Sequence, residues 1–159
     1  MNQEKDTVIE IKEDRYKNNC FATVNYYINE KKKVIACRIE PDVEKDYSSL
    51  TALFNPDHKG LGYKESMERS FFEMCGEQNI SFVGKAICMD DDEFNVEFGK
   101  NLAYDKAMFK LLEAKRKFIL NDVKELKGYI DADTAILEDI SKQVDKVTER
   151  FEKKLKEVM

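Results

Sequence analysis

The feature that most constrains this chain is a run of apolar residues spaced alternately four and three apart, which begins at Leu112 and continues to the C-terminal end. A spacing of 3.5 residues keeps these side chains on one side of a slightly under-wound helix, and about six such repeats are typical of a coiled coil. Arg116, Asp133 and Lys154 are the polar exceptions. The apolar residues that we expect to form a dimer are Ile119, Val123, Leu126, Ile130, Leu137, Ile140, Val144, Val147 and Phe151.

The helix that carries this repeat is expected to begin near Asn95, whose side chain can cap it, with Glu97 in the first turn. Counted from there, it would exceed about 90 Å at 1.5 Å per residue, which is more than one compact domain of this size could bury. The repeat must therefore meet a second helix, either in another copy of the chain or in a folded-back segment of its own.

Gly128 is the credible hinge for a folded-back helical hairpin, with a turn somewhere in residues 127–133. A turn need not preserve the phase of the repeat, but here the repeat passes Gly128 without an inserted or deleted residue. The sequence therefore favours a continuous helix and a homodimer. The parallel or antiparallel orientation of the two helices stays open.

The chain has 159 residues, of which 37% are charged. This fraction is higher than in an ordinary domain, and a long solvated helix accounts for the excess. We therefore expect an α+β head over residues 1–94 and a helical coiled-coil arm over residues 95–159. The formal net charge is −5, and residues 1–100 hold 20 acidic against 14 basic side chains, so the head is acidic. This balance disfavours general attraction to nucleic acid or to an anionic membrane surface.

A β-hairpin over residues 20–40 is predicted by two runs of β-branched and aromatic residues that flank Asn29-Glu30-Lys31-Lys32. If Ile28 pairs with Lys33, one face of the hairpin holds only apolar or tyrosine side chains. Pro41 is expected to end the second strand, because proline cannot donate a hydrogen bond to the neighbouring strand.

Three further elements complete the expected head. Residues 7–12 alternate in part and predict a short strand whose pairing stays open. Residues 64–75 carry apolar side chains at helical spacing and predict a short helix, which Gly76 stops. Residues 80–88 predict a third strand, in which Gly84 allows another backbone to approach closely. The predicted class is α+β: a small antiparallel sheet made of the hairpin and this strand, a short helix, and then the long C-terminal helix or helical hairpin.

The four cysteines, Cys20, Cys37, Cys75 and Cys88, form no C-x-x-C pair, and His58 is the only histidine. No apolar run approaches the roughly 18 residues of a membrane-spanning helix, and the first residues lack a signal-peptide core, so the expected location is the cytosol. Scattered cysteines there are usually reduced and buried. We therefore expect no disulfide framework, no zinc site or other cofactor, and no catalytic Cys–His pair.

The acidic run Asp90-Asp91-Asp92-Glu93 precedes the expected start of the long helix. It does not fit a calcium-binding loop, because Val96 and Leu102 stand where that loop needs glycine and glutamate. A metal-dependent enzyme would need further acids beside it, such as Asp42 or Glu44. Acidic groups favour a helix start through capping and the helix dipole. The alternative interpretation is an acidic binding surface.

The basic side chains gather in two triplets, Lys31-Lys32-Lys33 and Lys115-Arg116-Lys117. Each triplet is also explained as a solvated hairpin tip or helix face. The pair of glycines in Gly60-Leu61-Gly62 follows no predicted strand and lacks the third glycine of a nucleotide-binding loop.

Residues 82–88 read Phe-Val-Gly-Lys-Ala-Ile-Cys and are followed by the acidic run with Phe94, and then by Gly99, Ala103 and Ala107. This stretch resembles small phage and prophage proteins in which a V-G-x-A-x-C strand precedes a D-x-F turn and a G-x-x-x-A helix, often with a lysine-rich helical tail. The resemblance implies an origin in a mobile element. As a class, small acidic phage proteins are loosely similar to the inhibitors that phages use against host defence nucleases, including anti-CRISPR proteins.

The expected function is that of a non-enzymatic protein-binding module in the host cytosol. Its acidic head would engage a host protein, such as a nucleic-acid-binding nuclease, through Asp90, Asp91, Asp92 and Glu93, and its arm would join two copies. The alternative is a phage nucleic-acid-binding accessory protein that uses Lys115, Arg116 and Lys117 with the hairpin lysines.

Overall fold

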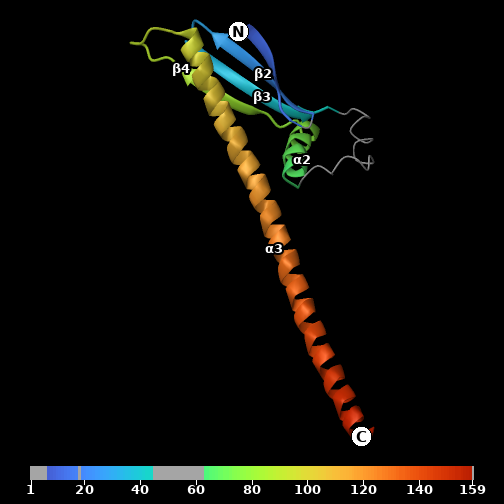
Figure 1. Cartoon of the computed structure of the whole chain (residues 1–159). Helices are drawn as coiled ribbons and strands as arrows, with labels where there is room; N and C mark the ends of the chain where they lie inside the picture. Colours follow the sequence, from blue (N-terminus) through green and yellow to red (C-terminus); the bar gives the residue numbers. More distant parts are fainter. Residues whose placement is uncertain (1–6, 18, 45–62, 159) are drawn as a thin grey trace. The chain divides into compact units, whose positions relative to one another are not determined.

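The computed structural model describes residues 7–17, 19–44 and 63–158. Within them, four antiparallel strands form one sheet in chain order, and the sheet is accompanied by a short helix and a long one (Figure 1). This confirms the α+β class. The elements are β1 (Thr7–Arg15), β2 (Cys20–Asn29), β3 (Val34–Val43), α2 (Tyr63–Glu77), β4 (Phe82–Ile87) and α3 (Val96–Val158). The sequence also predicts one helical turn at residues 50–54 and a loop at residues 56–62, and both lie outside the described residues.

The predicted first strand exists, extends to Arg15 and pairs with β2, with an irregularity between Val8 and Glu10. Its isoleucines do not face the core: Ile11 is 70% exposed. Acidic residues take the inward positions instead. Glu10 forms an ion pair with Lys100, and Asp14 accepts a hydrogen bond from the Tyr104 hydroxyl at 3.1 Å. The first turns of α3 therefore supply polar partners for the acidic side chains on the inner face of β1.

The hairpin forms with the predicted inner face but in a register shifted by two residues. Ile28 pairs with Ile35, not with Lys33. The turn occupies residues 30–33, where Lys33 adopts a left-handed conformation (φ 50°) and donates its N–H to Glu30 O at 3.2 Å. A two-residue shift returns each side chain to the same face of the strand. The predicted division into an apolar and a polar face therefore survives the wrong register.

Two predicted stops are wrong. Pro41 lies buried inside β3, which continues to Val43. The pairing of β3 with β4 ends at Ile39, so a proline beyond that point removes no hydrogen bond to β4. Gly76 likewise lies inside α2, where a Cβ would collide with the Asp42 carboxylate. The helix ends after Glu77, where Asn79 takes the left-handed conformation (φ 52°).

One face of the sheet is buried under α2 and the start of α3, and it forms the core with them. Alternate residues of β2 and β3 point into this core. The buried apolar residues are Cys20, Ala22, Val24, Tyr26, Ile28, Ile35, Cys37, Ile39, Val43, Phe71, Phe72, Cys75, Phe82, Ala86, Ala103, Ala107 and Leu111. Cys20, Cys37 and Cys75 are therefore packed as small apolar side chains, whereas Cys88 is only partly buried, and none of the four forms a disulfide.

The close approach predicted at Gly84 is confirmed. A Cβ on Gly84 would meet the backbone of Ala103 and Ala107 on α3, both of which are fully buried. Small residues recur every four positions along this part of the helix, and Gly99 lies against Ile35 in the same way. Glycine and alanine thus let the backbone of α3 lie directly on the sheet.

The chain divides into two compact units between Lys117 and Phe118. We call residues 96–117 of α3 the proximal helix and residues 118–158 the distal helix. The sequence placed the boundary between head and arm at residues 94 and 95, but the proximal helix supplies core residues and belongs to the head unit. Helical structure continues through Gly128 without the hinge of the hairpin alternative. Among the described helices, none has the length and apolar character needed to span a membrane.

The contact at Gly84 generates a stability prediction. Gly84→Ala should lower the free energy of unfolding by about 1–3 kcal/mol, because the added methyl group pushes the proximal helix off β4. Gly128→Ala is the matched control, since nothing lies within 4 Å of a Cβ there. That variant should gain about 0.5–1 kcal/mol from helix propensity. Urea unfolding followed by circular dichroism measures both, and equal effects in the two variants would contradict the close packing at Gly84.

Candidate binding surfaces

The acidic run forms an exposed turn between β4 and α3. All four side chains, Asp90 to Glu93, are exposed, and the backbone N–H of Asp92 donates to Met89 O at 3.0 Å. The capping role falls to Asn95, whose Oδ1 accepts from Phe98 N at 3.0 Å, as the sequence predicted. Within the described residues, none of the four carboxylates forms an ion pair with a lysine or arginine. The turn therefore presents negative charge that its own surroundings do not neutralise.

An apolar groove adjoins this turn, which the sequence did not reveal. Its volume is about 300 Å³, and Asp92 and Glu93 lie on its lining together with apolar side chains from β4 and α3. Three of those apolar side chains are unusually open to solvent: Ile87 at 66%, Phe98 at 67% and Leu102 at 36%. We call this combination of the acidic turn and the apolar side chains beside it the acidic groove. It can receive an apolar side chain and attract a positively charged one.

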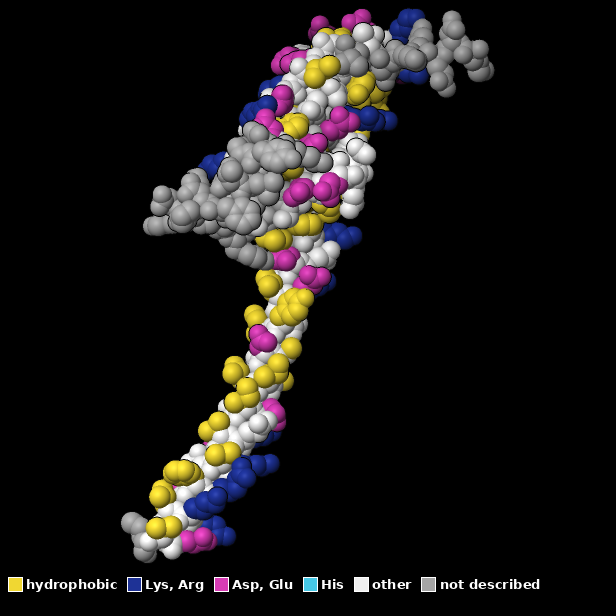
Figure 2. Space-filling model, turned by 90° about the vertical axis from the view of Figure 1, so that its right-hand side faces the viewer, with side chains coloured by type: hydrophobic (Ala, Val, Ile, Leu, Met, Phe, Trp, Pro, Cys, Tyr) yellow, Lys and Arg dark blue, Asp and Glu magenta, His cyan; other side chains and the backbone are white. Residues whose placement is uncertain are grey.

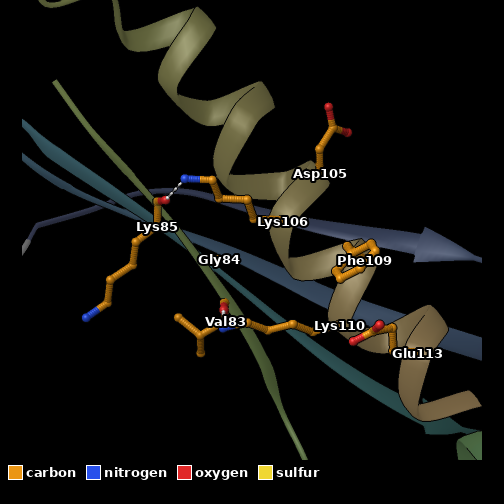
Figure 3. A pocket seen from close by; sticks show the side chains of 8 residues that line it. All are labelled: Val83, Gly84, Lys85, Asp105, Lys106, Phe109, Lys110 and Glu113. Atoms are coloured by element: carbon orange, nitrogen blue, oxygen red, sulfur yellow. Dashed lines mark hydrogen bonds between the residues drawn. The ribbon is translucent and has the colours of Figure 1, made fainter. Parts of the chain in front are cut away.

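A second and wider groove, of about 830 Å³, runs along β4, which is the last strand of the described sheet (Figure 3). Strand alternation gives the direction of its backbone groups. Because Cys88 N donates to Lys33 O at 2.9 Å, the peptide groups of Val83 and Lys85 point away from β3. These outward groups could pair with a further strand.

Two lysines of the proximal helix cover this edge. Lys106 Nζ donates to Lys85 O at 2.9 Å, and Lys110 Nζ donates to Val83 O at 2.6 Å (Figure 3). Phe109, on the same stretch of helix, is 62% exposed above the groove. The lysines occupy the carbonyl groups that an added strand would need, so this groove is better explained as a protected sheet edge than as a ligand site.

The distal helix carries the predicted apolar seam, which we define as the nine residues from Ile119 to Phe151 that the sequence analysis expects to form a dimer. Figure 2 shows these yellow side chains in a row along the helix. Eight of the nine are exposed, from 40% at Leu126 to 65% at Phe151, and Ile119 is partly buried. Within the described chain, the seam is therefore open to solvent from Val123 to Phe151.

Two tyrosines near β1, the buried Tyr26 of β2 and the part-buried Tyr104 of the proximal helix, serve structure. Burial raises the pKa of Tyr104, and the nearby Asp14 carboxylate raises it further. Burial also raises the pKa of Tyr26 to about 12. Both phenols stay protonated at neutral pH and act as hydrogen-bond donors there. They are thus poorly suited to exchange protons with a substrate.

The thiols show no sign of catalytic activation. Burial raises the pKa of Cys37 and of Cys75 to about 11, so neither is a thiolate at neutral pH. His58, which a Cys–His pair would need, lies outside the described residues. In the described part of the chain, no group of three or more His, Cys, Asp or Glu side chains is placed to hold a metal ion.

The basic triplet on α3 is partly neutralised. Lys115 Nζ forms an ion pair with Glu68 of α2 at 3.2 Å, and Lys115 and Glu68 are both only partly exposed. The hairpin triplet lies in the turn at residues 30–33. Neither triplet is joined in the described structure to a stacking platform of aromatic side chains. This arrangement gives little support to nucleic-acid binding.

The chain matches no known protein-family model, and comparison with curated proteins and with solved structures likewise finds no match.

The covered edge of β4 generates a prediction. Lys106→Met combined with Lys110→Met should uncover the outward carbonyl groups and promote strand-to-strand association, seen as a rise in light scattering and thioflavin T fluorescence on mild heating. Lys142→Met with Lys146→Met removes the same charge from the distal helix and should not produce this rise. If both double variants associate equally, loss of charge rather than loss of edge protection is the cause.

Proposed function

We propose that this protein is a non-enzymatic binding module that pairs with a second copy through its distal helix and presents the acidic groove to a basic protein partner. The observation that carries the proposal is the exposed seam on the distal helix. An isolated helix gains little stability in water without an apolar partner surface. A second copy of the same seam supplies that surface with matching length and spacing.

The energetic scale supports pairing. Burying the exposed part of one half-exposed apolar side chain contributes on the order of 1 kcal/mol, and the seam has eight exposed positions in each chain. Two facing seams therefore contribute a sum comparable with or larger than the roughly 4–15 kcal/mol lost in association. A helix that stays alone in water does not gain this free energy of apolar burial.

The chemistry of the acidic groove defines the partner. Unneutralised carboxylates beside Phe98 and Ile87 fit a surface that offers an apolar side chain flanked by lysines or arginines. Nucleic-acid channels of nucleases are lined by such basic residues, and a negative groove is steered toward them by charge. Together with the resemblance to small phage proteins, this leads us to propose a host defence nuclease as the partner class, in the manner of anti-CRISPR inhibitors.

Self-association is tested by light scattering combined with two matched double variants. Ile130→Lys with Leu137→Lys places charges in the seam and should convert a dimer to a monomer, because two unpaired charges would have to be buried. Ala132→Lys with Ala135→Lys adds the same charge on the exposed sides of the helix and should leave the dimer intact. A monodisperse wild-type protein of single-chain mass would contradict the proposal.

The acidic groove is tested with a panel of purified RNA-guided nucleases as probes. Asp91→Lys with Asp92→Lys should weaken binding at least tenfold and flatten its salt dependence, because like charges then face each other across the interface. Glu138→Lys with Asp139→Lys makes the same change of charge on the distal helix and should bind as the wild type does. Undiminished binding by the turn variant would rule out the acidic groove as the contact.

A further inference from the structure

We propose that the distal helices of two copies pair antiparallel and in full overlap, so that the beginning of each lies beside the end of the other. This inference rests on the self-association proposed above and specifies its geometry. Three independent features of the distal helix support it: the distribution of charge along it, the polar residues in its seam, and the residues that flank the seam.

Charge is unevenly distributed along the distal helix. Residues 118–141 hold six acidic and two basic side chains, whereas residues 142–158 hold four acidic and six basic ones. Figure 2 shows the dark blue side chains gathered toward the C-terminal end. A parallel pair would set negative against negative and positive against positive. In an antiparallel pair with full overlap, residues 142–158, with a net charge of +2, lie opposite residues 118–134, which hold four acidic and two basic side chains, and this lowers the electrostatic energy.

The polar residues of the seam favour the same orientation. In a parallel pair in register, each seam residue faces its own copy, so Asp133 would face Asp133 and Lys154 would face Lys154. The seam residues alternate between two positions of the seven-residue repeat. In an antiparallel pair, residues at one of these positions face residues at the other position. Asp133 and Lys154 occupy the same seam position. In an antiparallel pair, Asp133 and Lys154 therefore face neither their own copies nor each other.

The residues that flank one side of the seam are nearly the same when read in either direction. They recur every seven positions and are all exposed. Two of the three mirror pairs, Leu120 with Leu155 and Thr134 with Ser141, match in size and polarity, whereas Lys127 is opposite Thr148. In order they are Leu120, Lys127, Thr134, Ser141, Thr148 and Leu155. In an antiparallel pair with full overlap, these residues face each other from the two copies, so Leu120 lies near Leu155 and Thr134 near Ser141.

In a parallel pair, the two flanking leucines would face charged side chains. Each flanking position then faces the opposite flank of the partner, five residues earlier in the sequence. Leu120 would face Lys115, and Leu155 would face Arg150. The leucines are 48% and 54% exposed in the single chain, so only the antiparallel arrangement gives both an apolar neighbour.

The orientation has a consequence for the binding function. The two chains enter the paired segment from opposite ends, about 60 Å apart at 1.5 Å per residue. Two acidic grooves are then delivered to separate places rather than side by side. A partner with two binding sites, or two separate partner molecules, would suit such a dimer.

The test is a distance measurement by pulsed electron paramagnetic resonance on spin-labelled dimers. Leu120→Cys, Thr134→Cys and Leu155→Cys are labelled one at a time, each in a Cys88→Ser background, because the three remaining native cysteines are buried. Antiparallel pairing predicts about 50 Å between the two labels at residue 120 and again at residue 155. At residue 134, near the centre of the overlap, the two labels should lie within about 20 Å.

The outcomes separate this inference from the proposed self-association. Short distances at all three sites would show a parallel dimer, which overturns the orientation and leaves self-association standing. No dipolar coupling at residue 134 would overturn both, because that site stays close to its copy in either orientation. A short distance at residue 134 combined with long ones at residues 120 and 155 supports the antiparallel pair.

Discussion

An exposed apolar seam on a helix with no covering layer is the constraint on which the rest of this molecule depends. Water gives a long helix little stability by itself, and a 3.5-residue repeat of apolar side chains is typical of a helix that packs against another helix. In the described structure the seam faces solvent from Val123 to Phe151. The described residues of the head unit bury an apolar core of their own.

One continuous helix serves these two tasks through two different spacings. In the proximal helix, buried residues recur every four positions, from Gly99 through Ala103 and Ala107 to Leu111, and their small size brings the helix backbone against Gly84. In the distal helix the spacing alternates between three and four, which fits another helix rather than a sheet. The change of pattern explains why the division of the chain falls within α3 rather than at its first residue.

The head unit has two surfaces that differ in chemistry, the edge of β4 and the acidic groove. Lysines of the proximal helix cover the outward carbonyl groups of β4 and discourage strand pairing there. In the described structure, no lysine covers the acidic turn that follows β4, and its carboxylates lie beside the exposed ring of Phe98. An open apolar surface next to unneutralised charge is typical of a site that is completed by a partner.

The sequence by itself determined the elements whose signals are local: the seam, the asparagine cap of α3, the inner face of the hairpin, and the close approach at Gly84. Periodicity and backbone sterics act over a few residues, so they can be recognised without the fold. Only the tertiary structure decided the register of Ile28 against Ile35, the burial of Pro41 within β3, and the inward position of Glu10 opposite Lys100. It also brought Ile87, Phe98 and Leu102 together beside the acidic turn. These features depend on which distant residues meet, and because packing between elements sets those meetings, no local pattern in the chain records them.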